Sequence, residues 1–373
     1  MLPAIALSLA LTALPAPAAI DAEARAVLAK THANGLAIAL IDDGRVGYVQ
    51  AYGIRDAEKH ELTPDTVMYG ASLTKTVFAF TVLQLVDQNR LDLDTPIAAD
   101  LDHPLPDDGP YKDLAGDPRW RKITPRMVLT HSAGFANFAA MEPDKTLRIH
   151  FDPGTKYSYS GEGMILLQFA IEHGKTGEGL GLDLGALTQA NFDRLGMTRT
   201  SLVWRPDFAP NVADGWNDKG KAQPHYQRTK VRVAGSMDTT IADFARFAAA
   251  LVRGDGLSPT ARAEMVKRQL KITTAHQFPN FGPDLPSGQQ RKDLYAGLGV
   301  VVFDGPQGHG FFKGGHDSGT ANTLVCVEEG RRCALVLSND VRAETAFPEL
   351  VKFLLGDTGV PYDWEYGDYA GKS

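Results

Sequence analysis

Strand-forming segments lie at both ends of this sequence, and helical patterns fill the middle. Residues 36–52 predict two strands joined at Asp42-Asp43-Gly44, and further strands are predicted at 295–303, 323–329 and 332–339. Apolar residues recurring near helical period predict helices at 73–89, 124–131, 161–173, 183–195, 240–253, 258–269 and about 344–355. We therefore predict an α/β (α+β) fold, in which one antiparallel sheet is assembled from both chain ends and flanked by helices, with an inserted, mainly helical domain.

The same pattern sets the expected domain boundaries. Residues 20–66 together with 225–373 would form the sheet domain, and residues 67–224 the helical domain. Residues 1–19 carry no charged side chain and end in small residues, which predicts a signal peptide cleaved near Ala18 or Ala19; a buried N-terminal helix is the alternative. We expect a periplasmic or secreted protein without stable membrane insertion, because this apolar run is short and interrupted by proline.

Charge and histidine spacing narrow the class of partner. The formal net charge is -7, and no run of Lys and Arg exceeds two residues, so neither a nucleic acid nor an anionic membrane surface is an expected partner. The ten His residues show no H-E-x-x-H or other metal-ligand spacing, and we predict no metal and no cofactor. A small molecule or a peptide remains as the expected substrate.

The stretch "ASLTK" at 71–75 combines a hydroxyl and an amine at the start of a predicted helix. Ser72 and Lys75 are three positions apart, so they share a helix face and the amine can reach the hydroxyl. The backbone N–H of Ser72 is one of the unpaired donors of a helix start. This segment could therefore supply a nucleophile, its proton acceptor and half of an oxyanion hole. In the structural alternative, Ser72 caps the helix and Lys75 is solvated.

Two further stretches have the residue types that such chemistry needs. "PGTKYSYSGEGMILLQ" at 153–168 puts Tyr159 directly before a predicted helix, and a tyrosine can act as a base beside a cation that stabilises its phenolate. "FKGGHDSGTANTLV" at 312–325 puts His316 at the start of a predicted strand, whose edge could present backbone N–H groups to a substrate.

These three stretches, in this order, resemble the serine β-lactamase and penicillin-binding protein family, in particular its class C β-lactamases, D-Ala-D-Ala carboxypeptidases, D-aminopeptidases and related esterases. Four other segments resemble family motifs: "ITPRMVLTHSAGF", "LGMTRTSL", "AGSMDTTIADFARFAAAL" and "ALVLSN". The resemblance covers nearly the whole chain after the leader, and it implies the fold predicted above. His131, in "THSAG", is expected to be a structural turn residue.

The resemblance also implies roles for individual residues. Ser72 would be the acylated nucleophile, Lys75 its proton partner and Tyr159 the other half of the base, with Tyr157 the less suitable tyrosine. His316 would occupy the position of the Lys in the K-T-G motif. Gly319 would supply the second oxyanion N–H.

Two positions depart from the family pattern. Gly161 replaces the Asn of Y-x-N, an amide that helps to orient the substrate. Ser318 replaces the glycine of H-x-G, so that the sequence reads "HDS" at 316–318. Both departures affect the expected substrate more than the expected nucleophile.

The resemblance implies an exported serine hydrolase that cleaves an amide or ester through an acyl-Ser72 intermediate, with D-amino-acid peptides or carboxylic esters as the favoured substrates. A class C-like β-lactamase is one alternative. A penicillin-binding sensor or pseudoenzyme without turnover is another, motivated by Gly161 and Ser318.

Cys326 and Cys333 are the two cysteines of the chain. A hairpin turn centred on Glu329-Gly330 pairs them directly across two strands, which is close enough for a disulfide. In this register we expect a hydrogen-bonded strand pair. Two reduced, half-buried cysteines are the alternative.

Overall fold

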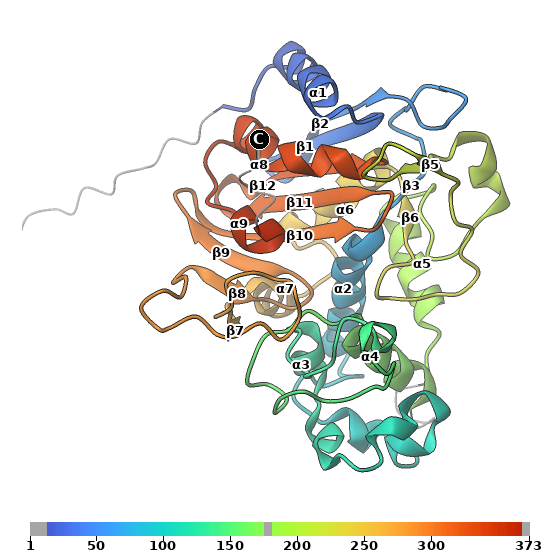
Figure 1. Cartoon of the computed structure of the whole chain (residues 1–373), viewed down its shortest axis with the longest axis vertical. Helices are drawn as coiled ribbons and strands as arrows, with labels where there is room; N and C mark the ends of the chain where they lie inside the picture. The colour runs from blue at the N-terminus through green and yellow to red at the C-terminus, as the bar shows by residue number, and fades with distance from the viewer. Residues whose placement is uncertain (1–12, 175–180, 368–373) are drawn as a thin grey trace, which may run out of the picture.

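The computed structural model describes residues 13–174 and 181–367, and its main feature is an antiparallel sheet of eight strands (Figure 1). The strand order is β2-β1-β12-β11-β10-β9-β8-β7. Their bounds are β1 Gly35–Asp42, β2 Arg45–Gly53, β7 Leu270–Lys271, β8 Leu294–Ala296, β9 Val301–Gly305, β10 Gly308–His316, β11 Ala321–Val327 and β12 Arg332–Ser338.

The sheet joins the two ends of the chain, as predicted. β1 pairs with β12, and Ala37 lies opposite Leu337 in that ladder. Seven of the eight β1 residues are buried, because helices cover both faces of the sheet at this point. The early hairpin and the late strands therefore fold as one unit.

Helices form a layer on each face of this sheet, and a third group lies beyond one edge (Figure 1). α1 and α8 pack together on one face, while α6 contacts β1, β2 and β12 from the other. α2 runs from the sheet toward α3 and α4, and Figure 1 shows these two below it. The bounds are α1 Pro17–Thr31, α2 Thr74–Asp87, α3 Pro125–Leu129, α4 Gly161–His173, α5 Leu184–Arg194, α6 Ile241–Arg253, α7 Pro259–Val266, α8 Phe347–Leu355 and α9 Tyr362–Tyr366.

Short elements connect these layers. Two small two-stranded sheets pair β3 (Met68–Tyr69) with β6 (Asp238–Thr239), and β4 (Gly215–Trp216) with β5 (Ala222–Gln223). The 3-10 turns are Ala71–Leu73, Ile97–Asp100, Leu105–Asp107, Gly109–Leu114, Pro118–Lys122, Ala139–Met141, Pro206–Asn211, Glu329–Arg331 and Val341–Ala346.

The predicted helices are present: α4 has the predicted bounds, and the others are shorter at one or both ends. One predicted strand is wrong. Residues 295–303 are not continuous: they are divided between β8 and β9 by a bend at Gly297 to Gly299. Gly299 has φ +72° and lies against α2, where a Cβ would be 2.4 Å from the Cβ of Ala79. β10 was not predicted, because its four glycines give it a weak strand signal. His316 consequently ends β10 instead of starting the next strand.

α1 covers the sheet with the buried side chains Ile20, Ala24 and Val27. The expected cleavage position at Ala18 or Ala19 falls in its first turn, while residues 1–12 of the expected leader lie outside the described residues. Leader cleavage and the domain boundaries stay predictions. No described helix combines the length and the apolar character that a membrane crossing requires.

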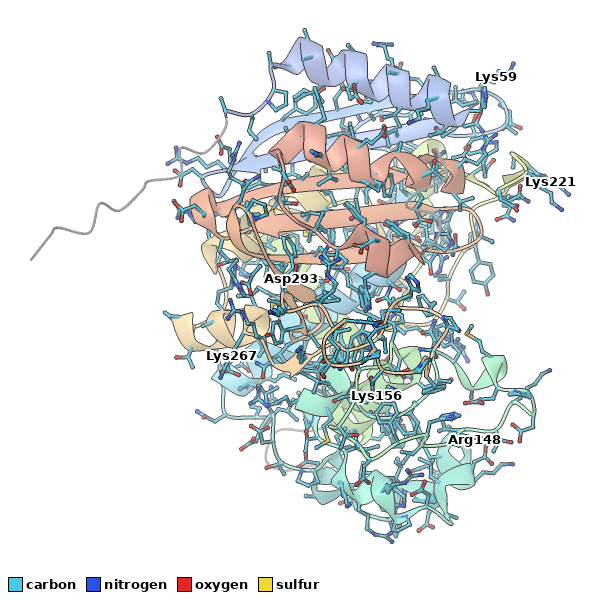
Figure 2. All side chains as sticks on the ribbon, turned by 60° about the vertical axis from the view of Figure 1, so that its left-hand side comes forward. Lys59, Arg148, Lys156, Lys221, Lys267 and Asp293 are labelled. Atoms are coloured by element: carbon cyan, nitrogen blue, oxygen red, sulfur yellow. A yellow bond between two sulfur atoms is a disulfide. The ribbon has the colours of Figure 1, made fainter. Side chains whose placement is uncertain are left out.

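Charged side chains project from well-separated parts of the surface. Figure 2 labels Lys59, Lys221, Lys267 and Arg148, which point outward from four different regions. Lys156 is different: its Nζ donates to the carbonyl oxygen of Gly282 at 3.0 Å, which ties the long loop 273–292 to the segment before α4.

A disulfide closes the β11–β12 hairpin. Cys326 lies opposite Cys333 in the ladder, in the predicted register, and the two sulfurs are bonded. The Cα atoms are 4.1 Å apart. That separation is typical of a non-hydrogen-bonded pair, so the expectation of a hydrogen-bonded pair was wrong.

Candidate active site

The turn before α2 fixes the position of Ser72. Ala71 has φ 46°, a left-handed conformation that is unfavourable for a non-glycine residue. Its surroundings hold it: the Gly70 N–H donates to Met237 O at 2.8 Å, and the Leu73 N–H donates to Gly70 O at 3.1 Å. This constrained turn holds Ser72 directly before α2, which begins at Thr74.

Lys75 is buried beside Ser72, with 1% of its surface exposed. Its Nζ donates to the Ser72 Oγ at 3.0 Å and to the carbonyl oxygen of Ala234. Burial lowers the pKa of Lys75, and the charge of Lys313 lowers it further, while Tyr159 acts in the opposite direction. The amine is therefore easier to deprotonate than an exposed lysine, as a proton acceptor for Ser72 would need.

Tyr159 lies between two ammonium groups. Lys313 Nζ donates to its hydroxyl at 3.2 Å, and Lys75 Nζ lies 4.9 Å from its ring centre. Burial raises the pKa of Tyr159, but the charges of Lys313 and Lys75 and hydrogen bonds with Ser72 and Lys75 outweigh it and bring the pKa to about 8. The structure thus brings the predicted trio of Ser72, Lys75 and Tyr159 together, with Lys75 and Tyr159 buried and Ser72 partly exposed.

His131 supports this group from behind. Its ring centre lies 4.4 Å from that of Tyr159, and its Nδ1 accepts a hydrogen bond from the Ser160 N–H at 3.1 Å. Burial and the charges of Lys75 and Lys313 hold the pKa of His131 well below its usual range. A neutral His131 can accept this bond and position the tyrosine without adding a third cation.

Lys313 is the residue that sequence reasoning missed, and the assignment of His316 is corrected. Alternate residues of a strand point to opposite faces, so Lys313 reaches Tyr159 while His316, three residues later, points away. The His316 side chain is 55% exposed, and its Nδ1 lies 3.1 Å from Glu344 Oε1. The sequence signal for Lys313 is "KGG" at 313–315, which places the lysine of the motif three residues before His316.

Gly315 brings the end of β10 against the Ser72 turn. A Cβ at this position would lie 2.8 Å from Gly70 O and 3.1 Å from Leu73 N, so only glycine allows this approach. The backbone beside Ser72 is therefore that of Gly315 and His316.

The expected oxyanion role of Gly319 is also corrected. Its N–H already donates to Asp317 Oδ1 at 2.8 Å, and the Thr320 N–H donates to the same oxygen at 2.9 Å. Gly319 instead closes a turn that packs on Gly215. Ser318 is exposed and its hydroxyl contacts Gln223 Oε1 at 3.1 Å, so it does not crowd the Ser72 group.

Neighbouring residues explain the loss of the Asn of Y-x-N. A Cβ on Gly161 would lie 2.6 Å from Phe138 Cε1, so a side chain there would collide with that ring. Phe278, from the loop 273–292, places its ring 5.5 Å from that of Tyr159 and is 42% exposed. Tyr157 is turned away and donates to Gln277 at 3.0 Å. The Phe138 ring therefore occupies the space that a side chain at position 161 would need, and the Phe278 ring lies beside Tyr159.

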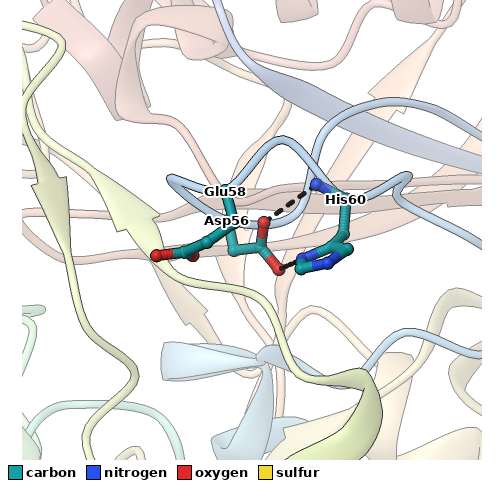
Figure 3. A group of neighbouring side chains, drawn as sticks. All are labelled: Asp56, Glu58 and His60. Atoms are coloured by element: carbon teal, nitrogen blue, oxygen red, sulfur yellow. Dashed lines mark hydrogen bonds and ion pairs between the residues drawn. The ribbon is translucent and has the colours of Figure 1, made fainter.

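One group outside this site has ligand types suited to a metal ion. Figure 3 shows Asp56, Glu58 and His60, whose ligand atoms all lie within 4.8 Å of one another. The backbone N–H of His60 donates to Asp56 at 2.9 Å, and the ring Nδ1 lies 2.7 Å from the same carboxylate. Glu58 and His60 are exposed, so this is a hydrogen-bonded loop that by itself indicates no metal.

The sequence of this chain matches a known protein family and several curated relatives. A family model described as Beta-lactamase matches residues 20–354. An unguisins hydrolase of Aspergillus campestris is 25% identical over 74% of this chain and 55% of the relative. A lovastatin esterase of Penicillium rubens is 30% identical over 48% of this chain and 52% of the relative. A D-aminopeptidase of Gluconobacter oxydans is 26% identical over 53% of this chain and 38% of the relative. The matched parts thus span about half or less of these curated relatives.

Solved structures share the fold. A class C beta-lactamase superposes with a TM-score of 0.70 at 17% identity, covering 90% of this chain and 94% of that one. An octameric penicillin-binding protein homologue from Pyrococcus abyssi superposes with a TM-score of 0.69 at 19% identity, covering 91% and 77%. These similarities show that the fold is shared. The chemistry of this chain has to be inferred from the residues described above.

Proposed function

The chain belongs to the beta-lactamase family, and from that premise we propose that it is an exported serine hydrolase that cleaves an ester or amide through a covalent acyl-Ser72 intermediate. The observation that carries the proposal is the buried contact series from Ser72 through Lys75 and Tyr159 to Lys313. If Ser72 merely capped the helix, as in the structural alternative, Lys75 would be exposed to solvent. Here the amine is buried and hydrogen-bonded to the hydroxyl that it would activate.

Acylation begins when the Ser72 Oγ attacks the carbonyl carbon. Its proton passes to the Lys75 amine or the Tyr159 phenolate, both of which have lowered pKa values. The bond to the leaving alcohol or amine then breaks, and the same pair returns the proton to the departing group. The Lys313 Nζ donates a hydrogen bond to the Tyr159 hydroxyl and so stabilises the phenolate form of Tyr159.

We place the developing oxyanion between the backbone N–H groups of Ser72 and His316. The first lies at the start of the helical turn, and the second follows Gly315, which contacts that turn. Deacylation repeats the sequence, with water as the nucleophile and Tyr159 or Lys75 taking its proton. The acid product leaves and Ser72 regains its hydrogen.

Esters are the favoured substrates. Phe278 places a partly exposed apolar ring beside Tyr159, and one matched relative carries the name lovastatin esterase. Amides of D-amino acids remain within the proposal, since another relative is named D-aminopeptidase.

A class C-like β-lactamase is the second candidate, and Lys313 is the observation that favours it. The sequence had suggested a histidine at this position, whereas the structure has a lysine on Tyr159.

Mass spectrometry followed over time tests these functions. A fluorophosphonate should label the wild type once and the Ser72→Ala protein not at all, and p-nitrophenyl butyrate should be turned over at least ~1,000-fold faster by the wild type. Turnover of nitrocefin at a comparable rate would favour the second candidate. A penicillin adduct that never clears, without ester turnover, would identify a sensor and overturn the proposal. The mass of protein recovered from the periplasm tests export, because cleavage should leave a chain beginning near Ala18 or Ala19.

A further inference from the structure

The short helix α9 is anchored against β11 and the ring of Tyr157. Trp364 is fully buried, its indole N–H donates to Thr274 Oγ1 at 3.3 Å, and its ring lies 5.6 Å from that of Tyr157. The Tyr362 hydroxyl lies 3.1 Å from Thr323 Oγ1 on β11. These anchors hold α9 in place and thereby fix the position of Glu365, which follows Trp364 directly.

The carboxyl group of Glu365 lies directly on β10. A Cβ at Gly314 would be 1.9 Å from Glu365 Oε1, so the carboxyl occupies the space that any side chain at 314 would need. The backbone of Gly314 donates a hydrogen bond to this carboxyl. The second oxygen, Oε2, is buried and has no hydrogen-bond partner among the described residues. A buried acceptor without a donor is unfavourable, and a ligand could supply that donor.

The strand geometry relates Glu365 to the reacting carbonyl. β9 pairs with β10 as far as Phe312, which lies opposite Val301, and the ladder ends there. Alternate residues of a strand direct their backbone groups to the same neighbour, so Gly314 and His316 both face this open edge. Two residues advance a strand by about 7 Å. Glu365 therefore lies about that far from the proposed oxyanion N–H of His316.

The nearby basic side chains of Lys313 and His316 form hydrogen bonds to groups other than Glu365 Oε2. Lys313 is engaged with Tyr159 and with Gly314 O, and His316 is paired with Glu344. Burial and the nearby Glu344 raise the pKa of Glu365 to about 8, against the charges of Lys313 and His316. A bound ammonium group would favour the ionised carboxylate, whereas a bound carboxylate would oppose it further.

Resting on the proposed hydrolase, we infer that Glu365 is a specificity-determining residue. Its Oε2 accepts a hydrogen bond from an ammonium group of the acyl donor, and the same carboxyl disfavours donors that carry a carboxylate at that place. The substrate class is thus an amine-bearing ester or amide.

Three p-nitrophenyl esters of equal chain length test this inference. They are the 6-aminohexanoate (cationic), the hexanoate (neutral) and the monoester of adipate (anionic). The wild type, Glu365→Gln and Glu349→Gln would be compared by the first-turnover release of p-nitrophenol and by kcat/KM. Glu349→Gln removes the same charge from an exposed ion pair with Lys30, so it is the matched control. A thermal melt checks that each variant is folded.

The wild type should prefer the cationic ester to the anionic one by about tenfold, and Glu365→Gln should remove most of that preference while the neutral ester changes by less than about threefold. Glu349→Gln should behave as the wild type. An unchanged cation-to-anion ratio in Glu365→Gln, with all three esters cleaved, would overturn the inference and leave the hydrolase intact. No nitrophenol release from any ester would overturn the hydrolase itself, and the inference with it.

Discussion

The Lys313 ammonium group donates to the Tyr159 hydroxyl at 3.2 Å, and its Nζ lies 4.8 Å from the centre of the same ring. This contact joins β10 to the segment before α4. It also explains why a fully buried tyrosine has a lowered pKa, since burial alone would raise it.

Replacing Lys313 should therefore move the pH dependence of the reaction. The phenolate fraction of Tyr159 grows as the pH rises through about 8. In Lys313→Ala the pKa of Tyr159 should rise, so the ascending limb of the kcat/KM profile should shift upward by about one unit or more, with an activity loss of about 10–100-fold near neutrality. Lys267→Ala, which removes an exposed ammonium group paired with Glu264, is the control. An unshifted limb in Lys313→Ala would show that Tyr159 is not the titrating base.

The two tyrosines of "YSYS" should differ sharply when each is replaced by phenylalanine. Tyr159→Phe removes the hydroxyl that contacts Lys313 and Ser72, and we expect a loss of at least ~100-fold in kcat. Tyr157→Phe removes a hydrogen bond to Gln277 and should cost about 1 kcal/mol of stability with little change in kcat. Steady-state kinetics and denaturant unfolding distinguish the two. Equal losses of kcat would contradict the assignment of Tyr159.

Gly315→Ala should damage both the fold and the site, because the new Cβ would press on Gly70 O and Leu73 N. Overpacking of this kind costs about 1–3 kcal/mol, and any relief would move the Ser72 turn. We expect a lower midpoint in urea and slower fluorophosphonate labelling per folded molecule. Gly109→Ala, at a position with no atom within 4 Å of the new Cβ, should change neither. Labelling at the wild-type rate in folded Gly315→Ala would show that β10 does not shape the site.

The Cys326–Cys333 bridge should contribute locally and little to overall stability. It closes a loop of sequence separation 7, and the stabilisation expected from a disulfide decreases as its loop shortens. The Cys326→Ala/Cys333→Ala double variant should lose only a few degrees in Tm, because the closed loop is short. The remaining loss comes from the packing of the two buried side chains. Intact mass after maleimide treatment of the unfolded, unreduced wild type gives the redox state. Two added maleimides would rule out the bridge.

The sequence by itself determined the fold class and three members of the site. The sheet could be predicted because strand signals lie at both chain ends. Ser72 and Lys75 could be related because three residues along a helix share a face, and Tyr159 by its place before α4. Cys326 and Cys333 could be paired because a short turn sets the register of a hairpin.

Only the tertiary structure decided which parts of β10 face Ser72. Lys313 and His316 are three residues apart, and a strand directs their side chains to opposite faces, so the position of β10 decided that Lys313 contacts Tyr159 and that His316 does not. The sequence is compatible with an oxyanion-hole role for the Gly319 N–H. The structure shows instead that this N–H donates to Asp317. Glu365 lies 51 positions from Gly314 in the chain, and its contact with Gly314 depends on the buried anchors of α9. Local spacing determines what shares a helix face or a hairpin, whereas contacts between distant segments depend on how the whole core packs.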